Sequence, residues 1–173
     1  MKILRDPVVL VSAAELGEVI GADLETVKNW IRREIITRAP IGGRQLRNRL
    51  FSADEVYKTA LKNELVKLGI PPSQASEAVN ALWKEWGKND VPEGWKVYAV
   101  LWLSNDKWNV ILCSQKISGG PLYKFGKSKS TEEMELPKQT CALIPISEIM
   151  ERVSSKLSEL LGELKNQEVK GKP

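Results

Sequence analysis

Apolar and polar positions divide the chain into a helical first half and a second half of strands followed by one long helix. Residues 12–15, Ser-Ala-Ala-Glu, have the spacing of a capping box and predict a short helix from Ala13 that Gly21 ends. Asp23 is a good N-cap for a second helix, and a turn containing glycine joins the two, as in a helix-turn-helix. The apolar side of the first helix is Leu16, Val19 and Ile20, and that of the second is Leu24, Val27 and Ile31.

Two more helices are predicted after a small hairpin. The apolar pairs Ile35-Ile36 and Leu50-Phe51 flank an arginine-rich Gly-Gly turn, which predicts a β-hairpin, or wing. Residues 52–55 repeat the capping-box spacing and predict a third helix that Gly69 closes, and Pro71-Pro72 can begin a fourth. The apolar positions of these two helices are Val56, Ala60, Leu61, Leu65 and Leu68, then Ala75, Val79, Leu82, Trp83 and Trp86.

The second half opens with strands. A polar stretch over 87–94 predicts the end of a first domain. Beyond it, 95–103 and 108–114 are predicted to pair, 116–138 to form an exposed loop, and 140–146 to form a third strand. One face of the first strand holds Trp95, Val97, Ala99, Leu101 and Leu103. The other face, Lys96, Tyr98, Val100 and Trp102, is also largely apolar, so another part of the protein must cover it.

A heptad pattern follows the last strand. Its spacings are 4, 3, 4, 3 and 4, and its members are Ile146, Met150, Val153, Leu157, Leu160 and Leu164. The pattern covers fewer than three heptads, so the stripe fits packing on the strands, dimerisation, or both. Residues 166–173 are expected to be disordered.

Composition narrows the class of protein. The 173 residues are 42% hydrophobic and 28% charged, typical of one or two small globular domains. No run approaches the roughly 20 apolar residues of a membrane span, and the N-terminus does not resemble a secretory signal, so a cytoplasmic location is expected. There is no histidine, and the two cysteines, Cys113 and Cys141, are too few for a zinc site. Neither enzymatic activity nor a cofactor is expected, because a phosphate-binding loop and a paired-carboxylate site are also missing.

The charge is concentrated in one window. The window from Lys28 to Arg49 contains seven basic residues and one acidic residue, Glu34, so its net charge is +6. The rest of the chain has a net charge of −2, which gives +4 for the whole sequence. A cationic strip on a nearly neutral body indicates a polyanionic partner, which favours nucleic acid.

The second predicted helix and the wing supply the candidate contacts. With Leu24, Val27 and Ile31 in the core, a helix at about 100° per residue directs Glu25, Thr26, Asn29 and Arg33 outward, toward a major groove. Lys28 and Arg32 lie at the margin of that face and are expected to contact the DNA backbone. The wing arginines, Arg38, Arg44, Arg47 and Arg49, are expected to bind phosphates or the minor groove. Trp30 is expected to pack under the wing.

These residues resemble a known family. The segment 21–33, GADLETVKNWIRR, followed by a wing, Leu50-Phe51-Ser52 and Leu68-Gly69-Ile70, is similar to the winged helix-turn-helix of the MerR superfamily. The resemblance covers residues 9 to 86 and implies DNA contacts for Thr26, Lys28, Asn29 and the wing arginines. Glu25 and Glu34 stand where the family often has arginine and glycine. Excisionases and the small subunit of phage terminases share the Thr-x-x-x-Trp version of this helix.

The predicted fold class is therefore α+β: a winged helix-turn-helix of four helices and a hairpin over 8–87, then an antiparallel sheet and an amphipathic helix over 95–165. The predicted function is sequence-specific binding of double-stranded DNA by a dimeric transcriptional regulator. One alternative is a phage-type architectural protein, either an excisionase or a terminase small subunit. A second is a protein-interaction module that does not bind DNA. Whether a small-molecule effector binds is left open.

Overall fold

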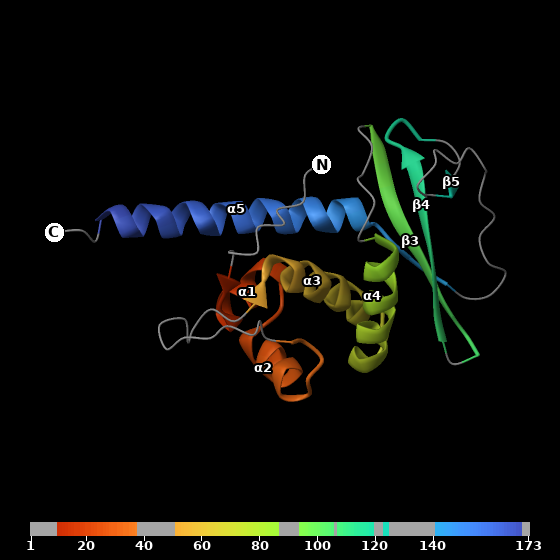
Figure 1. Ribbon diagram of the computed structural model, residues 1–173, viewed down its shortest axis with the longest axis horizontal. Coiled ribbons are helices and arrows are strands. Elements are labelled where there is room, and N and C mark those ends of the chain that lie inside the picture. The colour runs from red at the N-terminus through yellow and green to blue at the C-terminus, as the bar shows by residue number, and fades with distance from the viewer. Residues whose placement is uncertain are drawn as a thin grey trace.

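A computed structural model gives the fold, and it describes residues 10–37, 51–86, 94–105, 107–119, 123–124 and 141–170. The architecture is α+β. Helices from the first half form one group, a β-sheet stands at one end of them, and a long C-terminal helix crosses the group (Figure 1). Within the described ranges, no helix has the combination of length and apolar character that a bilayer span requires.

The first two helices have the predicted boundaries. α1 spans Ala13–Ile20 and α2 spans Leu24–Arg32. The capping box of α1 is complete, because the Glu15 amide donates to Ser12 Oγ at 3.3 Å and the Ser12 amide donates to Glu15 Oε2 at 2.6 Å. Gly21 ends α1 in the left-handed region with φ 69°, where glycine carries no steric penalty.

The strand that precedes α3 has a different partner from the predicted one. β2, Phe51–Ser52, pairs antiparallel with β1, Leu10–Val11. Ile35 and Ile36 form no strand, although the sequence predicts that they pair with Leu50-Phe51. The prediction of that pairing is wrong because the backbone groups have other partners: Phe51 pairs with Val11, and the Ile35 carbonyl accepts from the side chains of Lys62 and Ser76. The rest of the predicted wing lies outside the described residues.

α3, Ala53–Lys67, and α4, Pro72–Trp86, confirm the third and fourth predicted helices. Ser52 caps α3 by accepting from the Glu55 amide at 3.3 Å, and Gly69 follows the helix with φ 87°. Leu68 is an exception to the predicted apolar face. It is the C-cap residue of α3 and is 61% exposed.

Counted over the described residues, the larger of the two sheets has four antiparallel strands in the order β5-β4-β3-β6. β3, Trp95–Ser104, and β4, Lys107–Lys116, pair along their whole length, as predicted. β6, Ala142–Ile144, adds to the free side of β3, within the predicted third strand. β5, Tyr123–Lys124, pairs with β4 inside the segment predicted as a loop, and most of that segment is not described.

One face of the sheet packs on the helices. Val97, Ala99 and Leu101 alternate along β3 and are fully buried in the core, with α4 against β4 and α5 against β3. Val100 and Cys113 lie on the opposite face and are also fully buried. The expectation that this second apolar face is covered is therefore confirmed at its centre.

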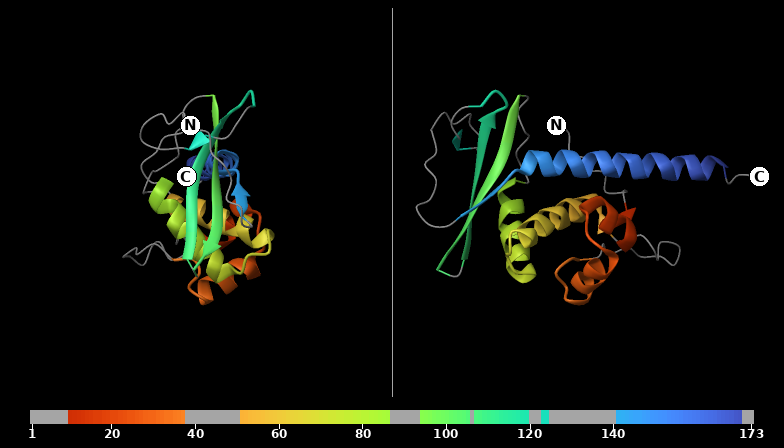
Figure 2. Two further views of the ribbon diagram at one scale, coloured as in Figure 1. Left: turned by 90° about the vertical axis from the view of Figure 1, so that its right-hand side faces the viewer. Right: turned by 180° about the vertical axis from the view of Figure 1, so that it is seen from behind.

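α5, Ile146–Lys170, carries the heptad stripe across α1 and α3 (Figure 2). Four members of the stripe are completely buried in the chain's own core: Ile146, Met150, Val153 and Leu157. The predicted packing on the strands is therefore only part of the outcome, because α5 contacts α1 and α3 as well as β3. Since these four side chains are buried within the chain, they offer no free surface to a second copy. Leu160 is half-buried against the same core, and the side chain of Leu164 is not described. The helix continues through Lys170 where the sequence predicts disorder from Asn166.

Polar contacts tie α5 to the first half of the chain. Arg152 Nη2 lies 2.6 Å from Glu64 Oε1 on α3, and Tyr57 and Ser154 share a hydrogen bond of 2.7 Å. Burial would raise the pKa of Glu64, but hydrogen bonds from Arg152 and Lys67 outweigh it and lower that pKa. One continuous apolar cluster includes residues from both predicted domains, so the two segments share a core.

Candidate nucleic-acid interface

The turn between α1 and α2 is tightly built. The amide of Ala22 donates to the carbonyl of Gly17 at 2.9 Å, which returns the chain across the end of α1. A Cβ atom on Gly17 would lie 2.8 Å from the carbonyl oxygen of Ala22, so only glycine fits this approach without a shift. Asp23 then caps α2. Its carboxylate accepts from the amide of Thr26 at 2.8 Å and from the Thr26 hydroxyl at 2.7 Å, and these bonds lower the pKa of Asp23.

Two side chains from distant elements support the end of α1. Asn63 of α3 is buried and donates to the carbonyl of Ile20 at 2.9 Å. Lys156 of α5 donates to the carbonyl of Glu18 at 3.0 Å. Both carbonyls belong to the last turn of α1, where the helix supplies no complete set of donors, and that of Glu18 also accepts from the Gly21 amide at 3.3 Å. Sequence analysis did not identify them, because neither residue type has a local pattern that indicates such a contact.

The buried side of α2 is rotated from the predicted one. Val27 is fully buried and Ile31 half-buried, as expected, but Leu24 is 40% exposed. Trp30 takes its place at 5% exposure and packs in the core, as a packing residue was predicted to do, while the wing under which it was placed lies outside the described residues. Since Trp30 buries more apolar area than a leucine, its side of the helix turns inward.

This rotation changes which polar residues lie at the centre of the outward face of α2. Lys28 and Arg32, predicted at the margin, now lie near its centre with Glu25 and Asn29, and all four are exposed. Thr26 is half-buried, and its hydroxyl is used in the cap of α2. Arg33 is exposed and is the C-cap residue rather than part of the helix. The wing arginines, Arg38, Arg44, Arg47 and Arg49, lie outside the described residues.

The outward face forms short-range polar pairs. Lys28 Nζ lies 2.8 Å from Glu25 Oε1, and Arg32 Nη2 donates to Asn29 Oδ1 at 2.7 Å. Exposed pairs at this spacing contribute roughly 0.2–0.5 kcal/mol, so a strongly charged ligand can replace them. On this face two cations, Lys28 and Arg32, stand against the anion Glu25, which gives a net charge of +1, and just beyond the helix the exposed Arg33 is followed by the exposed Glu34. The face can therefore attract an anion and present an amide to it.

The described part of the protein leaves this face open. α1 is the main packing partner of α2. α2 lies at the edge of the molecule, and α5 lies on the far side of α1 and α3 from it (Figures 1 and 2). Among the residues of known placement, no group of three histidine, cysteine, aspartate or glutamate side chains is arranged to hold a metal ion.

Comparison with known proteins does not assign this chain to a family. The sequence matches no protein-family model and no curated protein.

Proposed function

From this geometry we propose that the chain binds double-stranded DNA in a sequence-specific manner and acts as a transcriptional regulator. In this proposal α1 and α2 form a winged helix-turn-helix of the MerR type, and α2 is the recognition helix. The arginines of residues 38–50 bind phosphates beside it. A dimer would double the bases read, since one short helix covers few base pairs.

The observation that carries the proposal is the open cationic face of α2. A major groove about 12 Å wide admits an α-helix, whose diameter with side chains is about 10–12 Å, and α2 is a helix of nine residues. Its opposite side is anchored by Val27 and Trp30, so the face is rigidly supported. Asn29 can bond adenine through both its amide atoms, and Arg32 can bond guanine or a phosphate.

Selection of binding sites from random duplexes, with titrations at several salt concentrations, tests the proposal. Arg32→Ala should weaken binding and make the slope of log affinity against log salt shallower by about 0.9 if one phosphate contact is lost. Lys84→Ala is the matched control, because it removes one exposed cation from α4. Asn29→Ala should relax the preference at one base position.

Glu25→Gln should act in the opposite direction. It removes the only anion of the outward face and releases Lys28 from its ion pair, so binding to all duplexes should tighten. If the parent protein fails to bind any duplex at low salt, the proposal is wrong and an interaction module is favoured. If it binds as a ring-shaped oligomer in light scattering, a packaging role replaces regulation.

A further inference from the structure

α2 ends in a Schellman motif that has a glutamate at the position where helices usually have glycine. Arg33 is the C-cap residue, and Glu34 follows it in the left-handed region with φ 55°. The amide of Glu34 donates to the carbonyl of Ile31 at 3.1 Å, and the amide of Ile35 donates to the carbonyl of Trp30 at 2.9 Å. These two bonds fix the backbone of Glu34 relative to the helix.

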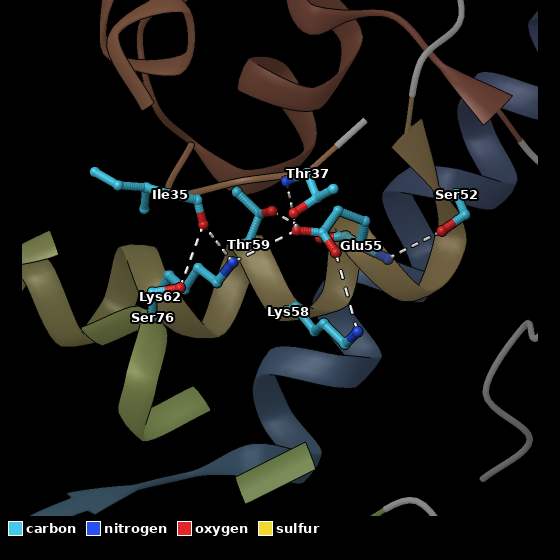
Figure 3. Close-up of polar contacts among 8 residues, drawn as sticks. All are labelled: Ile35, Thr37, Ser52, Glu55, Lys58, Thr59, Lys62 and Ser76. Carbon is cyan, nitrogen blue, oxygen red and sulfur yellow. Dashed lines mark hydrogen bonds and ion pairs between the residues drawn. The ribbon is translucent and has the colours of Figure 1, made fainter. Parts of the chain in front are cut away.

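Contacts from α3 and α4 hold the same turn from outside (Figure 3). The carbonyl of Ile35 accepts from the ammonium of Lys62 at 2.7 Å and from the hydroxyl of Ser76 at 3.3 Å. Lys62 is only 3% exposed, so this anchor belongs to the interior of the protein. A strained backbone conformation persists where surrounding contacts over-determine it, as they do here. Glu34 is therefore presented from a rigid base.

A glutamate is unfavourable at this turn on two independent grounds. A residue with a Cβ atom has a steric cost in the left-handed region that glycine avoids. A carboxylate at the C-terminal end of a helix also meets the negative end of the helix dipole. Glu34 is exposed and forms no ion pair or side-chain hydrogen bond with the described residues, so no contact among them offsets these costs.

The charged side chains on the outward face of α2 differ from Glu34 in this respect. Lys28 is paired with Glu25, and Arg32 is paired with Asn29. Glu34 lies two residues beyond Arg32, so their Cα atoms are within about 8 Å of each other. At this separation the Glu34 charge acts on any ligand that Arg32 contacts. An unpaired carboxylate on a fixed turn beside these cations points to a ligand that supplies a hydrogen-bond donor.

Few groups of duplex DNA can donate to a carboxylate. Ionised glutamate only accepts hydrogen bonds, and the donors in the major groove are the amino groups of cytosine and adenine. On adenine the amino group is flanked by the acceptor N7, which repels the second carboxylate oxygen. Cytosine itself carries no acceptor in that groove. Cytosine is therefore the base that this carboxylate favours.

We propose that Glu34 is a specificity-determining residue, which accepts a hydrogen bond from the N4 amino group of a cytosine at one end of the site read by α2. It disfavours duplexes with another base there, because its charge would then approach DNA without a donor. This role rests on the proposed function. Base selection is the benefit that accounts for a glutamate where the fold alone favours glycine.

Selection from random duplexes, followed by titration of the selected duplex and its single-base changes, tests this role in the full chain. The parent should prefer cytosine over thymine at one position by about tenfold. Glu34→Gln keeps the length and the backbone strain but adds an amide donor, so this position should shift toward adenine, which an amide bonds through N6 and N7. Glu151→Gln is the matched control, because it removes the same charge from an exposed position on α5, on the far side of α1 and α3 from α2. It should leave the selected motif unchanged.

Glu34→Gly separates base selection from stability. Glycine removes the steric cost of the left-handed turn, so the thermal midpoint should rise by about 2–4 °C. The preference for cytosine should nevertheless fall below about twofold, because the acceptor is gone. A protein that is more stable and less selective than the parent does not owe its lost selectivity to unfolding.

Several results would overturn this role while leaving the proposed function intact. One is a selected motif that neither Glu34→Gln nor Glu34→Gly alters. Another is tightening of all duplexes by the same factor in Glu34→Gln, which would mean that the charge acts without reading a base. Equal effects of Glu34→Gln and Glu151→Gln, or a lower thermal midpoint for Glu34→Gly, would also overturn it. A parent chain that binds no duplex overturns both proposals.

Discussion

Gly17 provides a sharp test of how α2 is placed against α1. The residue is buried inside α1, and an added Cβ would lie 2.8 Å from the carbonyl oxygen of Ala22 and 3.5 Å from Val27 Cγ2. The first contact involves backbone at the turn into α2, so it cannot be relieved by rotating a side chain. Gly17→Ala should therefore displace the turn and strain the junction.

The magnitude follows from two opposing terms. Overpacking of a buried position costs about 1–3 kcal/mol, whereas alanine gains about 1 kcal/mol over glycine in a helix interior. Gly162 of α5 supplies the matched control, because it is exposed and an added Cβ meets nothing within 4 Å. Gly162→Ala should gain the helix propensity of alanine without the cost of overpacking. The two variants should therefore differ in unfolding free energy by about 1–3 kcal/mol.

Urea unfolding followed by circular dichroism measures this difference. With equal m-values, the urea concentration at the midpoint should fall or remain unchanged for Gly17→Ala and should rise for Gly162→Ala. In thermal scans the gap should be about 2–4 °C for each kcal/mol. If Gly17→Ala is stabilised as much as Gly162→Ala, the close approach at the turn does not limit the fold, and the reasoning is refuted.

Three further predictions follow from burial and capping. Asp23→Ala should lower the thermal midpoint at pH 7. The difference from the parent should shrink as pH falls from about 4, the ordinary pKa of aspartate, through the lower pKa of Asp23 in the folded state, because the ionised carboxylate is the better acceptor for Thr26. Asp23→Asn, which keeps an acceptor for Thr26, should lose less. Met150→Ala should cost about 2–5 kcal/mol in urea unfolding, independently of protein concentration, whereas a concentration-dependent loss would indicate a dimer seam. Burial raises the pKa of Cys113 to about 11, so iodoacetamide at pH 8 should modify the partly exposed Cys141 first, as peptide masses would reveal; equal rates would contradict this burial.

Local signals predicted the elements of this fold well. Ser12, Gly21, Asp23 and Ser52 all act at the helix ends where the sequence places them. The reason is that a cap is satisfied by an atom within about three residues, so the information it needs lies beside it in the chain. The long strands β3 and β4 were equally predictable from the sequence, because a short turn joins them and brings them together.

The candidate site was predicted less completely. The residues of the outward face of α2 were predicted, but Lys28 and Arg32 lie at its centre and not at its margin, because Trp30 rather than Leu24 is buried. Two side chains that support the end of α1 were missed: Asn63 and Lys156. Their partners, Ile20 and Glu18, lie 43 and 138 residues away in the sequence, and no periodicity marks such a contact.

The chain's own pattern of residues therefore establishes where its helices and long strands lie, and where its positive charge is concentrated, since each depends on neighbours in sequence. Folding in three dimensions selects the buried side of α2, the partner of β2, and the use of the α5 stripe within one molecule. These outcomes depend on surfaces that meet from distant parts of the chain. Apolar area is buried wherever it finds the best-fitting partner, and no local pattern encodes that partner.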